Sequence, residues 1–273
     1  MAPLDLAVIV AYFALTIGVG LWVSRAQATA GDYFLGARNL PAWAVLFSIV
    51  ATETSAITVI SIPGLGARGD LTFLQLTFGY LVGRFAVAFW LLPGYFRGDQ
   101  ETAYQRIETR FGPTSRRLVS VVFLLTRLLG DGVRICAGSV PTAIVAMGGI
   151  TLLYTLLGGL KAVVWADVIQ LAVYVSGGVA ALVIAWQLAG GAEQALAMAA
   201  DAGKLKILNP VLSFTQTYTL LGGLVGGALL SAASHGTDQL IVQRLLATRS
   251  LRDAQVAVVG SGVAVILQFC LFL

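Results

Sequence analysis

The stretch Ser48–Gly66, SIVATETSAITVISIPGLG, is apolar enough to cross a membrane, yet five of its seven residues from Thr52 to Thr58 are polar. Polar side chains at membrane depth are costly and need an explanation. A helix broken at this point would free backbone carbonyls, and carbonyl and hydroxyl oxygens are the ligands that a hard cation such as Na⁺ binds. Helix packing, with Ser and Thr bonding back to their own carbonyls, is the alternative, but it does not explain Glu53.

The surrounding chain also favours a membrane protein. Of its 273 residues, 58% are hydrophobic and 11% are charged, and the mean hydropathy is +0.88. A transmembrane helix needs about 20 mostly apolar residues, and stretches such as VVFLLTRLLG lack the period-two alternation of barrel strands. The sequence therefore predicts an all-α polytopic membrane protein of about eight spans. These are Leu6–Val23, Trp43–Leu65, Leu71–Phe96, Arg117–Ala137, Pro141–Leu157, Ala162–Leu188, Phe214–Leu245 and Ala254–Leu273.

Basic residues collect in alternate connections between these spans. One set contains Arg25, Arg38, Arg97, Arg106, Arg110, Arg116, Arg117, Lys161, Arg244, Arg249 and Arg252, and the other contains Arg68, Lys204 and Lys206. Since basic loops stay in the cytoplasm, the richer set is predicted to be cytoplasmic and the amino terminus outside. The expected location is the cell membrane, with several passes. One of the basic connections, around Tyr104–Phe111, predicts a short amphipathic surface helix that ends at Gly112-Pro113.

A second apolar run, Phe214–Leu245, also carries polar residues deep inside it. Ser231, Ser234, His235 and Asp238 follow a glycine-rich start in which two pairs, Gly222/Gly226 and Gly223/Gly227, have the spacing that permits close helix contact. Two interrupted helices five spans apart are typical of a transporter built from inverted repeats, with its site at the interruptions. His235 is the only histidine, and such a residue either packs as a hydrogen-bonded side chain or contacts substrate or a proton.

Further ionisable residues lie in or near the spans. Asp167 can complement a helix dipole or serve as a cation waypoint at the cytoplasmic mouth. Asp238 is a candidate partner for an arginine such as Arg244. Four more residues are expected in buried pairs, with the i,i+4 spacing of the second and third favouring contact on one helix face: Arg84, Arg127, Asp131 and Arg134.

Several function classes lack support. Gly64, Gly66 and Gly69 spell GxGxxG, but the run follows an apolar helix rather than a strand, so it does not predict a dinucleotide site. The chain has no HExxH, GxSxG, P-loop or CxxC motif, and we expect no enzyme activity. The net charge of +4 follows membrane topology rather than a nucleic-acid patch, so the expected partners are the bilayer and a small solute. No protein partner is evident.

Five segments together resemble the sodium:solute symporter family, which includes sodium-coupled carriers of sugars, proline, pantothenate and iodide. They occur in family order over nearly the whole chain: DYFLGARNLPAW, SIVATETSA…IPGLGARG, LPGYFRGDQETAYQRIETRFG, YTLLGGLKAVVWADVIQ and GTDQLIVQRLLATRSLRDAQ. The fourth segment and TDQLIVQR are the most specific. The resemblance implies sodium-coupled symport of a small solute by alternating access.

The resemblance also implies an architecture, a LeuT-like inverted-repeat bundle with one extra amino-terminal helix. Residues 6–23 would be the extra helix, 43–188 the first five-helix repeat and 214–273 the start of the second repeat, all in one transmembrane domain. Both interrupted helices then take the first position of their repeats.

Sodium-site residues are also implied by the resemblance. Backbone oxygens of Ala51 and Thr54 correspond to the family's Na⁺ ligands. Glu53 lies where some relatives carry an acid important for sodium coupling, and Asp167 matches the family's acid near the sodium exit.

The same comparison assigns Ser55 and Thr58 to substrate-facing positions. Ser231, Ser234 and His235 fall on the part of the second interrupted helix that faces substrate in sugar-carrying relatives. The aromatic residues common there in those relatives are absent, which argues against sugar stacking in this mode.

Two departures from the family pattern bear on activity. The helix whose hydroxyls complete the family's sodium site would follow the last span, so the chain is expected to be truncated at its carboxyl end, with an incomplete Na⁺ site and no transport on its own. The passage from Arg134 to Pro141 is shorter than in the family, which predicts a deletion of roughly ten to fifteen residues. The alternative function is a membrane sensor or interaction module derived from a symporter.

Overall fold

The chain forms an assembly of helices in the computed structural model, which describes all residues except 1–2, 25–28, 99, 101, 137–140 and 214. The predicted deletion between Arg134 and Pro141 falls on 137–140 and so lies outside the described residues. Within the described part, the β structure is one isolated bridge between Leu40 and Thr248. The helices are α1 (Pro3–Ser24), α2 (Ala30–Leu35), η1 (Gly36–Arg38), α3 (Ala42–Glu53), α4 (Ala56–Arg68), η2 (Leu71–Phe73), α5 (Leu74–Ala86), η3 (Val87–Leu91, a π-helix), α6 (Leu92–Phe96), α7 (Gln105–Phe111), α8 (Pro113–Cys136), α9 (Pro141–Leu188), α10 (Ala192–Asp201), α11 (Leu220–Gly236), α12 (Gln239–Leu246) and α13 (Leu251–Phe272).

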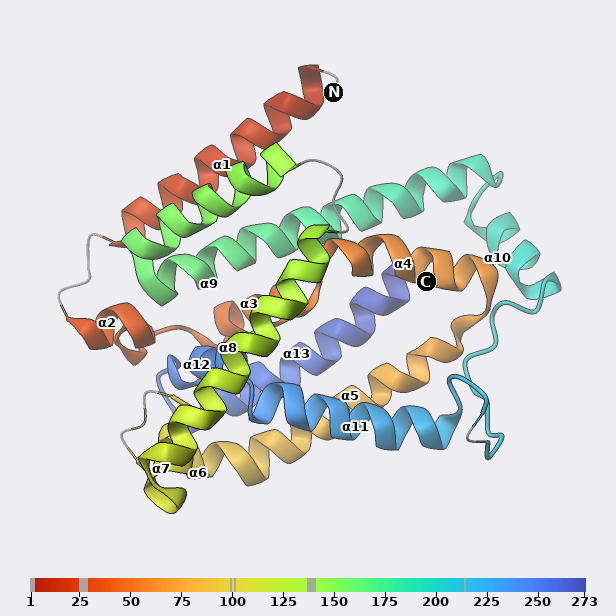
Figure 1. The fold of residues 1–273 in the computed structure, drawn as a ribbon. Coiled ribbons are helices and arrows are strands. Elements are labelled where there is room, and N and C mark those ends of the chain that lie inside the picture. The colour runs from red at the N-terminus through yellow and green to blue at the C-terminus, as the bar shows by residue number, and fades with distance from the viewer. Residues whose placement is uncertain (1–2, 25–28, 99, 101, 137–140, 214) are drawn as a thin grey trace.

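The core lies where α3, η3, α6, α12 and α13 meet (Figure 1). Apolar side chains from these elements form one cluster, and α9 adds Val164 to it. Its members with no exposed surface include Ala44, Val45 and Ile49 of α3, Val87 of η3, Leu92 of α6, Val242 and Leu245 of α12, and Ala257 and Val258 of α13. The central part of the bundle is therefore built around α3, which carries the first polar interruption.

Each of the two expected interruptions is a physical break. The second predicted span is divided into α3 and α4, which are bent by 70° at Thr54-Ser55. Pro63 does not end α4, which continues to Arg68. The seventh predicted span begins at Leu220 and is divided at Thr237-Asp238 into α11 and α12, so its break lies after His235 rather than among the preceding serines.

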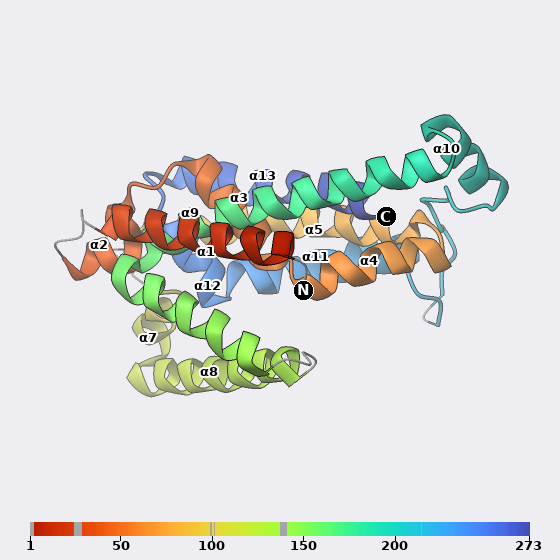
Figure 2. The same ribbon diagram turned by 90° about the horizontal axis from the view of Figure 1, so that it is seen from above.

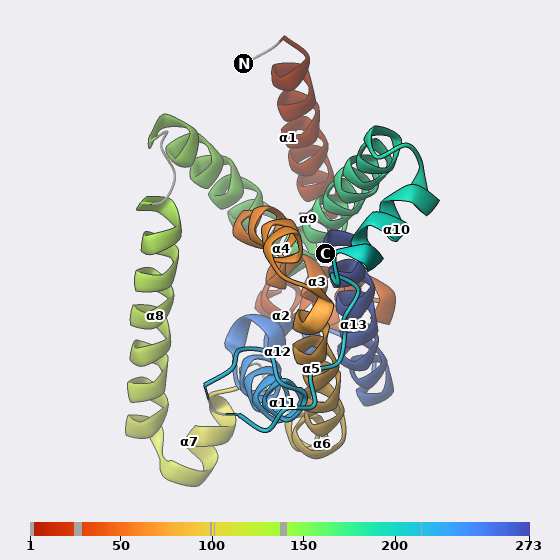
Figure 3. The ribbon, with the colours of Figure 1, turned by 90° about the vertical axis from the view of Figure 1, so that its right-hand side faces the viewer.

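α9 consists of two helical segments that meet at Gly159, where the chain reverses its direction (Figure 3). Gly159 has φ 55° and ψ −155°, a conformation available to glycine at little cost. A Cβ there would lie 2.6 Å from the Tyr33 carbonyl oxygen. The reversal falls between the predicted spans Pro141–Leu157 and Ala162–Leu188, and α1 packs beside it through Gly20, whose added Cβ would lie 3.1 Å from the Tyr154 Cβ.

α5 and α11 approach each other through glycines. A Cβ on Gly79 of α5 would lie 2.2 Å from the Gly223 carbonyl oxygen, and one on Gly227 of α11 would lie 2.5 Å from the Leu76 carbonyl oxygen. Only one of the two predicted glycine pairs is used, because Gly226 has no atom within 4 Å of its Cβ position. This contact brings the polar end of α11 beside α5.

Peripheral helices extend from this bundle. α7 is the predicted amphipathic helix and ends at Gly112, where φ is 84°. α8 stands apart from the bundle in Figure 3, and Figure 2 shows α7 and α8 together below the other helices. α10 is a further peripheral helix in the connection between α9 and α11.

By length and composition, four described helices can cross a membrane, and the number is five if the bent pair α3 and α4 is counted as one span. The four are Leu6–Val23, Leu71–Phe96, Gly148–Leu188 and Leu251–Phe272. Since Gly148–Leu188 contains the reversal at Gly159, it corresponds to parts of two predicted spans. The count of eight spans stays a prediction.

Candidate functional site

The break between α3 and α4 leaves backbone carbonyls available. Thr54 N–H bonds the Val50 carbonyl at 3.1 Å and closes the last turn of α3. Beyond it, within the described residues, the carbonyl oxygens of Ala51–Thr54 accept no backbone hydrogen bond. The last four carbonyls of any helix lack intrahelical donors, and two of the residues that carry them here, Ala51 and Thr54, are buried. Free carbonyls at a helix break are ligands suited to Na⁺.

α4 starts with a reciprocal cap. The Ser55 hydroxyl accepts from Thr58 N–H at 3.2 Å, and the Thr58 hydroxyl accepts from Ser55 N–H at 3.3 Å. This capping box fixes the direction in which the chain leaves the break. Ser55 therefore has a structural role in addition to any contact with substrate.

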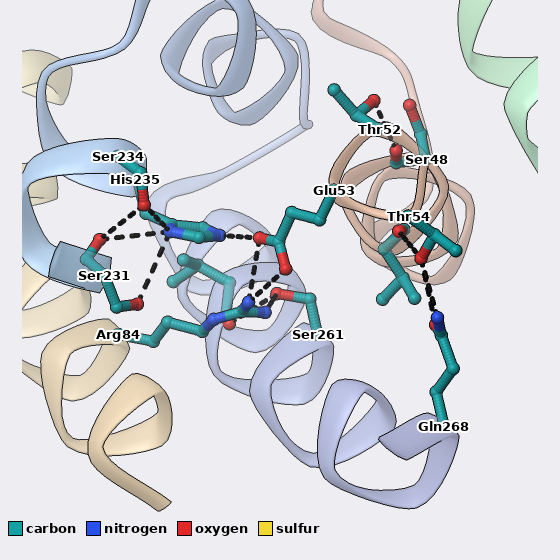
Figure 4. A network of polar contacts seen from close by, with 12 residues as sticks. Ser48, Thr52, Glu53, Thr54, Arg84, Ser231, Ser234, His235, Ser261 and Gln268 are labelled. Carbon is teal, nitrogen blue, oxygen red and sulfur yellow. Dashed lines mark hydrogen bonds and ion pairs between the residues drawn. The ribbon is translucent and has the colours of Figure 1, made fainter. Parts of the chain in front are cut away.

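Glu53 turns toward α5 and α11 (Figure 4). Arg84 Nη2 of α5 donates to both carboxylate oxygens, at 2.8 and 2.6 Å, and Arg84 Nη1 donates to Ser261 Oγ of α13 at 2.5 Å. His235 Nε2 of α11 contacts Glu53 Oε1. The Arg84 side chain is 0% exposed and the Glu53 side chain 25% exposed, so Glu53 is the more exposed member of this pair.

The neighbouring residue turns the other way. Thr54 Oγ1 donates to the Val50 carbonyl at 2.7 Å and accepts from Gln268 Nε2 of α13 at 2.8 Å. Figure 4 shows the Glu53 and Thr54 side chains on different sides of the end of α3. The break is therefore attached to α5 and α11 through one residue and to α13 through the next.

A cavity of about 500 Å³ opens beside the break. Its walls come from α4, α5, α11, α13 and the end of α3, and they combine polar side chains with aromatic and aliphatic ones. The polar or ionisable members are Glu53, Thr54, Thr58, Ser61, Tyr80, Arg84, Ser231, Ser234, His235 and Gln268, and the apolar members include Ile57, Phe73, Leu230 and Phe269. A cavity in which several polar groups converge beside apolar walls is typical of a small-molecule site.

A second cavity of about 610 Å³ lies at the far end of α4 and shares Ser61 with the first. Asp70, at its edge, accepts hydrogen bonds from Thr72 N–H at 3.0 Å and from the Thr72 hydroxyl at 2.6 Å. Partial burial works to raise the pKa of Asp70, but these hydrogen bonds outweigh it, and its pKa lies below the ordinary value. The two cavities therefore adjoin each other at Ser61 of α4.

Asp167 belongs to a separate polar cluster. Its Oδ2 accepts from Ser48 Oγ at 2.5 Å and from Arg244 Nη2 at 3.0 Å, and Arg244 Nε also donates to Ser48 Oγ at 2.8 Å. Asp238 has an arginine partner, as expected, but this partner is Arg127 of α8 rather than Arg244. The α9 reversal at Gly159 places Asp167 beside α3 and α12.

Most of the predicted substrate residues come together around the first cavity. Thr58, Ser231, Ser234 and His235 line it, whereas Ser55 does not. Thr54 and Glu53 line it too, while Asp167 lies outside it.

The sequence did not indicate the partners from α5 and α13. Arg84 was expected in a buried pair, but its partner was not predicted. Ser261 and Gln268 are buried polar residues within an apolar span, a signal of the same kind as at Thr52–Thr58. Among the described residues, no group of three or more His, Cys, Asp and Glu side chains is placed to hold a metal ion.

Comparison with known proteins gives a consistent result. The model of the sodium:solute symporter family matches residues 33–273. The chain is 30% identical to the human sodium/iodide cotransporter, over 96% of this chain and 43% of the relative. It is 30% identical to a sodium/sialic acid symporter of Proteus mirabilis, over 92% of this chain and 53% of the relative.

A solved structure is also similar. It is described as the substrate-bound outward-open state of a Na⁺-coupled sialic acid symporter with a novel Na⁺ site. The TM-score is 0.85 at 27% identity, and the match covers 98% of this chain and 59% of that one. The chain thus spans about half the length of the relatives that it matches.

Proposed function

The chain belongs to the sodium:solute symporter family, and on this premise we propose that it takes part in carrying a small solute across a membrane together with Na⁺. The observation that supports this most directly is the break at Thr54-Ser55, where free carbonyls lie next to a cavity of about 500 Å³. An ion and a solute held side by side stabilise the same conformation, which is the physical basis of coupling.

For the ion, we propose the carbonyl oxygens of Ala51 and Thr54 as ligands. Carbonyl oxygens satisfy a hard cation without a formal charge on each ligand. Glu53 is adjacent in the chain to Thr54, and we propose that it affects the affinity for sodium without being one of the two carbonyl ligands. Asp167, paired with Arg244 beside α3, is proposed as an exit waypoint for the ion.

For the solute, we propose that Thr58, Ser231, Ser234 and His235 contact it in the cavity, with Ser55 acting through the α4 cap. The hydroxyls both donate and accept hydrogen bonds, so they suit a small polar molecule. The names of relatives include iodide, monocarboxylates and sialic acid, and these are the first probes to try.

In architecture, we propose that residues 6–23 are an extra helix, that 43–188 form one repeat and that 214–273 begin a second, inverted repeat. The positions of the two broken elements, α3–α4 and α11–α12, support this division. A polypeptide of these 273 residues alone is expected not to accumulate solute, since its relatives are about twice as long.

Sodium binding to the purified full-length protein tests the proposal. Melting temperatures are measured in NaCl and in KCl at equal ionic strength. At 100 times the dissociation constant, a ligand stabilises the folded state by about 2.7 kcal/mol, so the melting temperature is expected to rise with the logarithm of the Na⁺ concentration. Equal melting curves in the two salts would contradict sodium binding. Uptake of labelled iodide, lactate and sialic acid by proteoliposomes under a sodium gradient then tests for the solute.

A further inference from the structure

The Glu53 carboxylate is bound by side chains from two other helices, α5 and α11. Arg84 donates to both of its oxygens and His235 contacts one of them. The guanidinium is planar, so one fixed side chain sets the position of both oxygens. Arg84 is in turn fixed to α13 by its 2.5 Å bond to Ser261 Oγ.

His235 can keep this contact in more than one protonation state. Its Nδ1 lies 2.9 Å from Ser234 Oγ and 3.0 Å from the Ser231 carbonyl oxygen. A neutral ring can donate through Nε2 to Glu53 while Nδ1 accepts from the Ser234 hydroxyl. A charged ring can donate through both nitrogens. Glu53 is therefore held on α11 as well as on α5.

If Glu53 turned to coordinate sodium directly, Arg84 would lose its only charged partner among the described residues. Arg84 is fully buried, and a buried charge without its partner is strongly destabilising. We therefore expect the pair to stay together when the ion binds. Glu53 is also one of the four residues, Ala51–Thr54, whose carbonyls are free, so fixing its side chain fixes the backbone of that segment.

We propose that Arg84 is the positioning residue of the sodium site: through Glu53 it orients the free carbonyls of Ala51–Thr54 without touching the ion. The opposing bond from Gln268 to Thr54 supplies the second attachment of the same segment. This inference rests on the proposed sodium-coupled function. On this proposal, α5 and α11 help to position the ion ligands. The same two helices line the solute cavity.

The test measures binding of ²²Na⁺ to the full-length protein, as wild type and with Arg84→Lys, Arg84→Gln, and Glu53→Gln combined with Arg84→Gln. Partners that orient metal ligands typically contribute 10–100-fold to affinity. Arg84→Gln is expected to weaken sodium binding at least about tenfold. Arg84→Lys keeps the charge but cannot bond both Glu53 oxygens and Ser261 in one plane, so an intermediate loss is expected.

The double variant separates positioning from folding. It leaves no buried charge unpaired within the pair, so its melting temperature in KCl is expected to lie closer to wild type than that of Arg84→Gln. Its sodium affinity is expected to stay as low as in Arg84→Gln, because both changes interrupt one connection. Arg116→Gln is the control, because Arg116 pairs with Glu108 at the surface. The protein that carries this substitution is expected to bind sodium as the wild type does.

The outcomes are distinct. Wild type that binds no sodium overturns the proposed function itself. If the wild type binds sodium, and Arg84→Lys and the double variant bind it with the same affinity, only the positioning role of Arg84 is overturned. If Arg84→Gln does not fold, these two variants still decide the question.

Discussion

Asp167 and Arg244 are a buried pair formed by residues 77 positions apart. Their side chains are only 13% and 7% exposed. Ser48 bonds to both, so the pair ties α9 and α12 to α3, the helix that ends at the break. A buried pair contributes little relative to apolar packing, but breaking it leaves an uncompensated charge.

Asp167→Asn is therefore expected to lower the stability of the protein by about 3–5 kcal/mol. Differential scanning fluorimetry of the detergent-solubilised protein measures the change. Asp201→Asn, at an exposed site on α10, is the matched control and should melt as wild type does. Adding Arg244→Gln to Asp167→Asn should recover part of the loss, and a further decrease would argue against the pair as the cause.

At the scale of elements, glycine positions decide how closely helices approach. α5 and α11 are in contact through Gly79, Gly223 and Gly227, and this contact sets α11, with His235, opposite Glu53. The adjacent Gly226 faces open space. Of the adjacent glycines Gly226 and Gly227, therefore, only Gly227 is needed for the close approach of α5 and α11.

Gly79→Leu is expected to separate α5 from α11 and to lower the melting temperature strongly, since even a Cβ there would lie 2.2 Å from the Gly223 carbonyl oxygen. Overpacking typically costs about 1–3 kcal/mol and sometimes more. Gly226→Ala is the control, and it should be neutral or stabilising because alanine favours helix. Equal effects of the two changes would refute the close contact.

Gly159→Ala tests the reversal of α9. Alanine at φ 55° and ψ −155° is strained, and its Cβ would meet the Tyr33 carbonyl oxygen at 2.6 Å. Backbone strain of this kind costs about 1–3 kcal/mol. Gly177→Ala, on the same helix and with no atom within 4 Å, should be tolerated. Reduced yield and thermal stability of Gly159→Ala relative to Gly177→Ala is the expected result.

At the scale of the whole molecule, the charge distribution predicts topology. α7 lies in the basic set of connections and α10 in the other set, so they are expected on opposite sides of the membrane. Thr109 of α7 and Glu193 of α10 are both exposed and suit cysteine labelling.

With Cys136 and Cys270 replaced by serine, a membrane-impermeant maleimide should label Glu193→Cys in intact cells. Thr109→Cys should react only after the membrane is opened. If Thr109→Cys were labelled in intact cells as strongly as Glu193→Cys, the predicted topology would be wrong, because α7 would then lie outside the cell. The unsubstituted serine variant gives the background.

The sequence by itself determined the helical membrane class, the two interrupted apolar runs and six of the residues that line the cavity: Glu53, Thr54, Thr58, Ser231, Ser234 and His235. These properties are local: hydropathy over about 20 residues identifies a span, and polar residues inside one mark a break. For the same reason the short amphipathic helix and the cluster at Thr52–Thr58 could be predicted with useful boundaries.

Only the tertiary structure decided which side chains pair with the buried charged residues. Glu53 meets Arg84 at a separation of 31 residues and His235 at 182, and Asp167 rather than Asp238 pairs with Arg244. Sequence spacing orders neighbours within a helix, but these contacts depend on helix crossings and on the reversal at Gly159. Such contacts are fixed by packing of the whole bundle, where a buried charge must find its partner wherever the fold brings one.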